Sequence, residues 1–247
     1  MKKIDLRYQI ALFGNYDEIV PNSDNIKFFF DSFANKGMIP YQTQEVNIDV
    51  TSKEPSQKTI QRLSLADSER KWDIKFNTDR IDITFVNANI GITEVISKED
   101  FLKETMFFLE KIDGKFQRSH KRIAFVAHYL FSPTDASKSS KPFTNSINYF
   151  DDKPILEWSN RVATRVKLSY DDQEDVINVI SEMGRINQPM KINNAVSLFQ
   201  GIALNVDINT IPENETYRFQ LKDLKSIFEE MLKIEKIVVE QNTQKID

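Results

Sequence analysis

The sequence predicts an α+β protein made of two similar units of antiparallel sheet plus helices. Several segments carry an apolar residue at every second position, which is the period of a strand with one face in a core. Two segments, 98–112 and 220–234, carry apolar residues at helical spacing instead. Each half of the chain runs through strands and ends in such a helix, which indicates an internal duplication.

The first half is expected to contain a strand, a helix, several antiparallel strands and a second helix. Alternating apolar residues predict the first strand at 6–12. We expect Ser23 to cap the first helix and Gly37 to end it, because serine can accept a hydrogen bond from a free amide and glycine adopts left-handed backbone. Next we expect a strand at 41–50, a solvated loop at 51–58 and a strand at 60–65. A hairpin follows, with strands at 71–76 and 80–86 and its turn at 77–79, and it has one apolar face and one charged, solvated face. The last element is a helix at 98–112, capped by Ser97 and Asp100 and ended by Asp113 and Gly114.

The second half repeats this order. Residues 122–131 predict a strand that is apolar on both faces and therefore central in the sheet. The remaining expected elements are an exposed loop at 132–142, a short helix within 143–158, strands at 161–169 and 175–181 joined by the acidic turn 170–175, a strand at 201–208, and a long amphipathic helix from about Phe219 to about Val239. The apolar stripe of this last helix is wide enough to pack on a sheet and to leave residues for a partner.

The two halves match at a constant offset. Ile83 then falls on Ile202, and the apolar positions of the helix at 98–112 fall on those of the closing helix. This match divides the chain into units 1–117 and 118–247, which we expect to pack as one compact body. The alternative is that any two α+β units share this order, because the sequence identity between the halves is slight and only the apolar pattern agrees.

Composition excludes several classes of chemistry. The chain of 247 residues has a net charge of −4 and a pI near 5.4, which argues against a wide nucleic-acid footprint. It contains no cysteine, so disulfides, thiolate nucleophiles, thiolate zinc sites and iron–sulfur clusters are excluded. Six glycines are too few for a glycine-rich phosphate cradle, and no cofactor is expected. Neither a signal peptide nor an apolar run long enough to span a membrane is present, so we expect no membrane association and a cytoplasmic location.

A basic segment follows the helix at 98–112. Its residues are Lys115, Arg118, His120, Lys121 and Arg122. Cations gathered in one connection can contact a phosphate backbone or an acidic partner surface. Three further cations on one face of a later strand could extend this patch: Arg161, Arg165 and Lys167. The alternative is an ordinary solvated loop between a helix and a strand.

The two histidines lack the spacing of a metal site. His128 lies inside a strongly apolar strand, where the alternatives are a core or sheet-face histidine with a hydrogen-bond partner and a catalytic base. Asn205, Asp207 and Asn209 share one face of a strand, and their oxygens could coordinate a hard cation or orient a ligand. The alternative there is the solvated face of an antiparallel strand, and no metal is expected.

Five segments resemble a known family. They are KWDIKFNTDRIDITF, FLKETMFFLEKI, KRIAFVAHYLF, ALNVDIN and LKSIFEEMLKI, which together span about residues 70 to 240. The pattern of a strand hairpin, helix, strand, late strand with alternating Asp and closing helix is similar to that of a sporadically distributed family of uncharacterised bacterial proteins of about this length. The family has no assigned catalytic residues. Its patchy distribution implies a role in bacterial conflict or defence against phage.

The function expected from these observations is a non-enzymatic interaction or scaffold component of a bacterial system. A protein partner is expected, and a homo-oligomer stays open. This hypothesis predicts an exposed apolar patch. The alternative is a nucleic-acid-binding component that uses the basic segment and the cationic strand face, with an affinity that falls steeply with salt. A hydrolase built from carboxylates and His128 ranks third and requires Asp207, His128 and another acid within hydrogen-bond reach.

Overall fold

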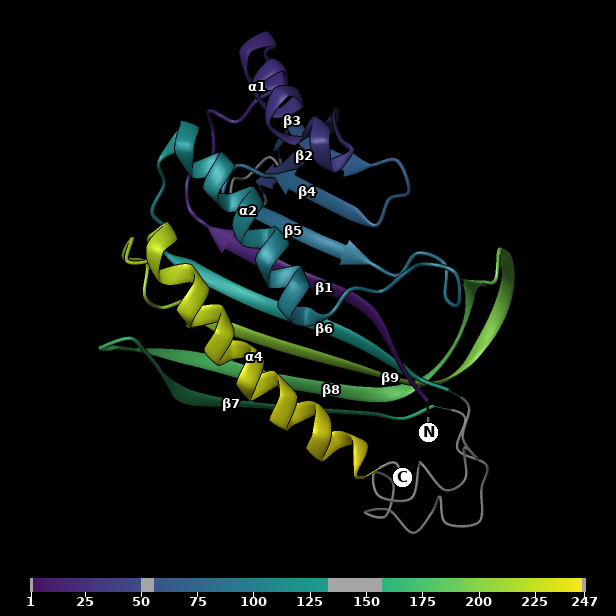
Figure 1. Cartoon of the computed structure of the whole chain (residues 1–247). Coiled ribbons are helices and arrows are strands. Elements are labelled where there is room, and N and C mark those ends of the chain that lie inside the picture. Colours follow the sequence, from purple (N-terminus) through teal and green to yellow (C-terminus); the bar gives the residue numbers. More distant parts are fainter. Residues whose placement is uncertain (1, 50–55, 133–156, 246–247) are drawn as a thin grey trace.

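A computed structural model describes residues 2–49, 56–132 and 157–245 of the chain (Figure 1). These residues form a nine-stranded antiparallel sheet with the strand order β2-β3-β4-β5-β1-β6-β9-β8-β7. The strands are β1 (Lys3–Phe13), β2 (Met38–Asp49), β3 (Ser56–Asp67), β4 (Trp72–Phe76), β5 (Arg80–Val86), β6 (Arg122–Phe131), β7 (Ser159–Tyr170), β8 (Gln173–Ile192) and β9 (Ala195–Thr210). The helices are α1 (Ser23–Phe33), the 3-10 turn η1 (Ala34–Lys36), α2 (Lys98–Phe116) and α4 (Leu221–Thr243). The predicted α+β class with an antiparallel sheet is confirmed.

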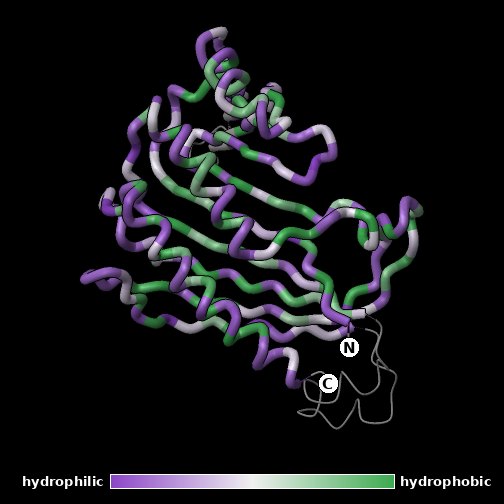
Figure 2. The backbone as a smooth tube through the Cα atoms, in the orientation of Figure 1, coloured by the Kyte–Doolittle hydropathy of each residue, from purple (hydrophilic) through white to green (hydrophobic). Residues whose placement is uncertain are grey.

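The helices lie on one face of the sheet, with α2 near the central strand β1 and α4 running over β9 and the edge strand β7 (Figure 1). The core fills the space between them with alternate strand residues such as Ile10, Phe125 and Leu204. Hydrophobic and hydrophilic residues alternate along the strands accordingly (Figure 2). The other face, which carries Gln9 and His128 and which no described helix covers, is called the open face below.

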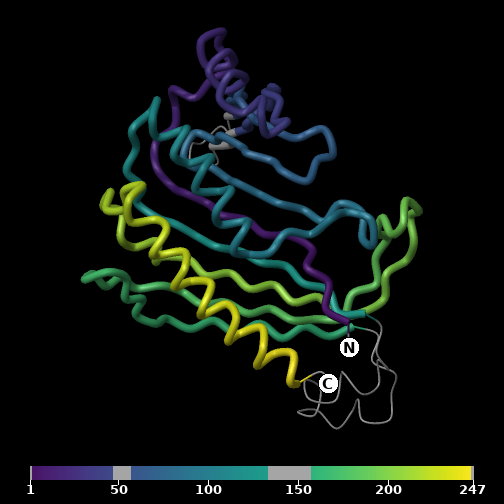
Figure 3. Tube along the Cα trace, in the orientation of Figure 1, coloured from purple at the N-terminus to yellow at the C-terminus, as the bar shows by residue number. Residues whose placement is uncertain are grey.

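Pairing of β1 with β6 joins the two predicted units. The register runs from Lys3 opposite Phe131 to Phe13 opposite Arg122. The two strands lie side by side at the centre of the sheet (Figure 3). As predicted, β6 is an inner strand, and one sheet therefore continues from residues of unit 1–117 into residues of unit 118–247.

Helix α2 begins as the sequence predicts and ends later than expected. The Ser97 hydroxyl accepts a hydrogen bond from the Asp100 amide at 3.0 Å and donates one to the Asp100 carboxylate at 2.7 Å. The helix continues through Gly114 to Phe116, whose ring packs against the aromatic residues of α1. This packing outweighs the cost of about 1 kcal/mol for a glycine within a helix. Gln117, with φ +46°, ends the helix.

Helix α1 is capped one residue earlier than predicted. The Asn22 side chain accepts a hydrogen bond from the Asn25 amide at 2.8 Å, so Asn22 rather than Ser23 is the cap. Gly37 ends the helical segment with φ +68°, as predicted.

The hairpin of β4 and β5 is confirmed, but its second face is not fully solvated. Asp82 and Thr84 of β5 are buried although they point away from the helices. Gln9 Nε2 and Arg80 Nε donate hydrogen bonds to the Asp82 carboxylate at 2.6 and 2.8 Å. Long polar side chains of adjacent strands therefore cover this part of the open face.

Strands β8 and β9 are much longer than predicted. The last pair of β6 with β9 is Phe131 with Ile202, and the last pair of β7 with β8 is Ser159 with Gly184. Beyond these pairs β8 and β9 continue as a two-stranded ribbon over residues 185–201, which we call the arm.

The arm closes in a tight turn at Asn193 and Asn194. Both residues have positive φ, 49° and 66°, as a type I′ hairpin turn requires, and asparagine tolerates this conformation best after glycine.

Some predictions concern residues outside the described ranges. These are most of the loop at 132–142, most of the helix within 143–158, and the start of the loop at 51–58. Residues 56–58 of that expected loop belong to β3. In the described part of the chain, each helix is too short or too polar to cross a membrane.

Candidate functional site

A row of polar side chains crosses the second half of the open face. Direct opposition places Arg7 of β1 beside His128 of β6, then Asn205 of β9, Glu182 of β8 and Arg161 of β7. Their chain neighbours on β6, β8 and β9 point into the core beneath the helices. Opposing side chains in adjacent strands lie about 5 Å apart, so the row forms one continuous polar strip.

His128 of β6 lies within this strip between Arg7 of β1 and Asn205 of β9. Burial lowers the pKa of its imidazole to about 4, and the nearby Arg7 guanidinium lowers it further in the same direction. The ring is therefore neutral at pH 7, with one nitrogen able to donate and one able to accept.

Within the described residues, two buried atoms of the strip lack a hydrogen-bond partner, namely Arg7 Nε and Asn205 Oδ1. Another nitrogen of the Arg7 guanidinium donates to Gln9 Oε1 at 2.5 Å, so only part of that group is satisfied. A buried polar atom without a partner is unfavourable by about 1 to 3 kcal/mol, and such atoms often mark the place of a bound water or ligand.

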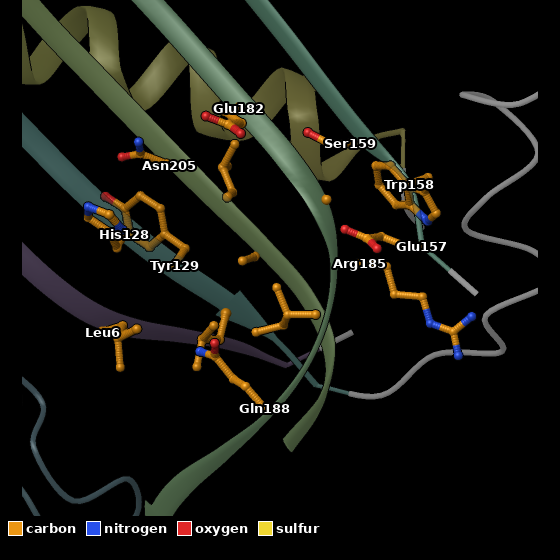
Figure 4. Close-up of a pocket in the computed structure, with 15 residues that line it drawn as sticks. Leu6, His128, Tyr129, Glu157, Trp158, Ser159, Glu182, Arg185, Gln188 and Asn205 are labelled. Carbon is orange, nitrogen blue, oxygen red and sulfur yellow. The ribbon is translucent and has the colours of Figure 1, made fainter. Parts of the chain in front are cut away.

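The strip borders a recess of about 350 Å³ (Figure 4). His128, Asn205 and Glu182 lie along one side of the recess, on three adjacent strands. Trp158 and Arg185 lie across from them, where β7 begins and the arm leaves the sheet (Figure 4).

The floor of the recess consists of small and apolar residues. Gly184 and Ala203 are directly opposite each other, and Leu130 and Ile186 adjoin them. A Cβ atom on Gly184 would lie 2.8 Å from the Trp158 carbonyl oxygen, so the approach of these two strands requires glycine there.

The arm is attached to the loop that follows β5. Asn89 Nδ2 donates to Asn194 Oδ1 at 2.6 Å, and the Asn194 amide donates to Asn89 Oδ1 at 3.1 Å. Phe199 of the arm packs with Ile90 of the loop and Leu130 of β6 in a second hydrophobic cluster. Figure 3 shows the arm curving from the end of the sheet toward this loop. Both ends of the arm are therefore held in place.

The outer side of the arm carries two exposed apolar residues. The exposed fractions of Val196 and Leu198 are 78% and 59%. They alternate with Phe199 and Ser197, which follow the opposite side of the ribbon. The two residues thus form a small apolar surface on a projecting element.

The structure distributes the basic segment over several environments. Lys115 lies in the last turn of α2 and donates to Asn25 Oδ1 at 2.9 Å. Arg118 forms an ion pair with Glu18. Lys121 is half-buried, and its amide donates to the Phe13 carbonyl at 2.8 Å.

The other two members of the segment are also engaged. His120 is buried, with Nδ1 2.7 Å from the Tyr16 hydroxyl, and burial lowers its pKa to about 4. Arg122 Nε donates to the Thr210 carbonyl at 3.3 Å, and its guanidinium stacks 4.6 Å from the Phe13 ring centre.

The three cations of β7 share the open face, as predicted from their spacing. Arg165 pairs with Glu213, and Lys167 pairs with Glu174 at 3.0 Å. The Glu213 carboxylate interacts with one cation of β7, Arg165, and with one of the basic segment, Arg122. The Arg165 hydrogen bond lowers the pKa of the Glu213 carboxyl most, and the charge of Arg122 contributes in the same direction.

Asn205, Asp207 and Asn209 do not converge on one point. Asp207 accepts a hydrogen bond from Asn209 Nδ2 at 2.8 Å, while Asn205 belongs to the row of His128. Across the described ranges, no three His, Asp or Glu side chains are grouped as a metal ion would need. The residues that the sequence reasoning missed are Arg7, Glu182 and Trp158.

No protein-family model matches the chain, and no curated protein is similar to it in sequence. Fold and site together define the class to which the described residues belong: an α+β protein with a nine-stranded antiparallel sheet, helices on one face, and a polar recess at the base of a projecting arm on the other.

Proposed function

We propose that the protein is a non-enzymatic interaction protein that docks a protein partner on the outer side of the arm. The observation that supports this proposal is the exposure of Val196 and Leu198 on an element that extends past both neighbouring strands. Burial of one such side chain in an interface contributes about 1.5 to 3 kcal/mol. The occupant would be a protein with a matching apolar groove.

The anchored geometry of the arm favours docking. A mobile ribbon would lose conformational entropy on binding, and the free-energy cost is about 0.5 to 1.5 kcal/mol for each side chain that is immobilised. The hydrogen bonds of Asn89 to Asn194 and the packing of Phe199 already hold the ribbon in one position. A partner therefore meets a preorganised surface.

We extend the proposal to an internal duplication, for which the strand pairing is the support. Within each half, the first strand pairs antiparallel with the last, β1 with β5 and β6 with β9, and a helix follows. The hairpin β4–β5 turns within three residues, 77–79, whereas the hairpin β8–β9 carries the whole arm. In this interpretation the arm is an addition to the second unit, which suits a role in binding. The family resemblance extends the proposal to a cytoplasmic system of bacterial conflict or phage defence.

The test is affinity purification of the tagged full-length chain from its native host, with nuclease treatment and mass spectrometry. The variant Val196→Asp/Leu198→Asp is compared with Ile237→Asp, a matched control on α4 with 53% exposure. A stoichiometric protein that is lost from the arm variant and kept by the control supports the proposal. A stoichiometric protein that both variants retain, or none with the wild type, overturns it.

A second candidate function is nucleic-acid binding, and one observation favours it. Phe13 lies on the open face between two guanidinium groups, with Arg80 5.6 Å and Arg122 4.6 Å from its ring centre. An aromatic ring flanked by cations can stack a base beside a phosphate. The measurement is binding of a single-stranded oligonucleotide at several salt concentrations, with Arg118→Glu/Arg122→Glu compared with Lys103→Glu. A flat salt response, or no binding at low salt, removes this candidate.

A further inference from the structure

The recess at the base of the arm offers hydrogen-bond acceptors at one end. Asn205 Oδ1 is buried and has no hydrogen-bond partner among the described residues, and Glu182 is exposed directly beside it on β8. The neutral ring of His128 supplies a further acceptor nitrogen on the other side of Asn205. A group that carries several N–H donors would satisfy all three side chains.

The charges around this end favour a cation. Glu182 lines the recess at this end, while Glu157 lies on the other side beside Arg185, the one cationic side chain among the described lining residues (Figure 4). Arg7 lies at the far end of the strip, because β6 and β9 separate its strand β1 from the strand of Glu182, β8. A cation bound beside Glu182 is therefore far from the positive charge of Arg7.

Arg161 of β7 is a second cation close to that end. It stands opposite Glu182 on β7 and is exposed. Within the described part of the chain, no ion pair joins the two side chains, although their register would allow one. The Glu182 carboxylate is thus available to a ligand, with Arg161 as a weak competitor.

The floor of the recess is apolar. Leu6, Leu130, Ile186 and Ala203 adjoin the polar strip within the same volume of about 350 Å³. Sites for small molecules typically have this size, with an apolar lining and a few placed polar groups. The ligand that fits has a charged donor group at one end and a short apolar chain.

We propose that the recess binds an organic cation, a guanidinium or primary ammonium group on a short apolar chain. The cationic group contacts the Glu182 carboxylate and Asn205 Oδ1, and the chain lies on Leu130 and Ala203. A guanidinium fits better than an ammonium, because its planar fork can donate to both acceptors at once. Two sources supply this chemistry: a free amine or guanidine, and the Arg or Lys side chain of a protein segment.

The first experiment titrates the full-length protein with butylguanidinium, with butylammonium and with butyrate as the anion of matched chain length. Binding is followed by calorimetry and by the indole NMR signal of Trp158, which lines the recess. We expect butylguanidinium to bind and butyrate not to bind. Equal binding of butyrate, or no binding of either cation at millimolar concentration, overturns the proposal.

Variants then locate the site. Glu182→Gln should weaken butylguanidinium binding about tenfold, because the hydrogen bond then loses its charged acceptor. Arg161→Ala should strengthen it, and Glu229→Gln, an exposed acid on α4, should leave it unchanged. Glu182 is exposed, so its substitution is not expected to disturb folding, and circular dichroism checks this. Unchanged affinity in Glu182→Gln contradicts the assignment.

A final comparison separates the two sources and the two proposals. An N-acetylated tripeptide with a central Arg that binds more tightly than butylguanidinium indicates a protein side chain, and weaker binding of the tripeptide indicates a free small molecule. The arm variant Val196→Asp/Leu198→Asp should keep its affinity for butylguanidinium, because these residues lie on the outer side of the arm. The proposal of partner docking on the arm and the proposal of cation binding in the recess can therefore be refuted separately.

Discussion

Glu235 of α4 accepts a hydrogen bond from the hydroxyl of Tyr129 on β6, with its carboxylate fully buried beneath the helix. Burial, and then the Glu235 charge, raises the pKa of the Tyr129 hydroxyl far above its ordinary value, so the phenol stays a donor. Lys98, at the start of α2, forms an ion pair with the same carboxylate. One acidic side chain thus links both long helices to the centre of the sheet.

Removal of Lys98 alone should be strongly destabilising. Lys98→Met leaves the Glu235 charge buried without its cation, and we expect the free energy of unfolding to fall by about 3 kcal/mol. The double variant Lys98→Met/Glu235→Gln should recover a large part of this loss, because no buried charge remains. Lys36→Met, which breaks the more exposed pair with Glu104, should cost less than about 1 kcal/mol. Urea unfolding measures all three, and a double variant that is no more stable than Lys98→Met would contradict this account.

His120 should make the stability of the fold fall in acid. Burial lowers its pKa to about 4 in the folded protein, against about 6.5 in the unfolded chain. Between these values the unfolded chain binds a proton that the folded protein does not, so stability decreases as pH falls from about 6.5 toward 4. In His120→Gln the slope of unfolding free energy against pH should be shallower by about 1.4 kcal/mol per pH unit in this window. Urea unfolding at several pH values tests this, and an equal slope in wild type and variant would refute it.

Local signals in the sequence predicted the elements whose geometry is local. The capping residues of α2 are three positions apart, and the turn of the β4–β5 hairpin is three residues long, so neighbouring residues determine both. The arm was not predicted. Its residues 185–201 mix Pro189 with polar side chains and lack a clear alternation, and its strand conformation depends on pairing between β8 and β9.

The candidate site was also predicted only in part, because some of its features depend on pairing between distant strands. His128 and Asn205 were both predicted as members of a possible polar site, Asn205 together with Asp207 and Asn209 on one strand face. Their grouping with Arg7 and Glu182 depends on the register of four strands that are far apart in the sequence. Tertiary pairing sets this register, and a single sequence does not reveal it.

Gly201 should be intolerant of any side chain. A Cβ atom at this position would lie 2.3 Å from the carbonyl oxygen of Phe131, where the arm leaves the sheet. Gly201→Ala should therefore lower the free energy of unfolding by about 1 to 3 kcal/mol, since backbone must shift to relieve the overlap. Gly114→Ala in α2 is the matched control, because its Cβ would meet nothing within 4 Å. That change should stabilise the protein by about 0.5 to 1 kcal/mol through helix propensity. Thermal unfolding compares the two, and a neutral Gly201→Ala would show that the strands approach each other less closely.

The contact of Asn89 with Asn194 should hold the arm without contributing much to the stability of the whole fold. Asn89→Ala removes the two hydrogen bonds of 2.6 and 3.1 Å between the loop after β5 and the arm. Each contributes about 0.5 to 1.5 kcal/mol, so we expect amide exchange of Ile90 and Asn193 to become about tenfold faster. These two amides donate to carbonyls across the same contact, at 3.0 Å each.

Hydrogen exchange of the native protein, read residue by residue, measures this effect. Asn187→Ala is the control, because Asn187 is an exposed residue of the same arm that lies away from the loop. The control should leave both exchange rates unchanged, and in Asn89→Ala the amides of β1 and β6 should exchange as in the wild type. Equal acceleration throughout the sheet would mean that the loop, the arm and the core open together, and that the arm has no separate stability.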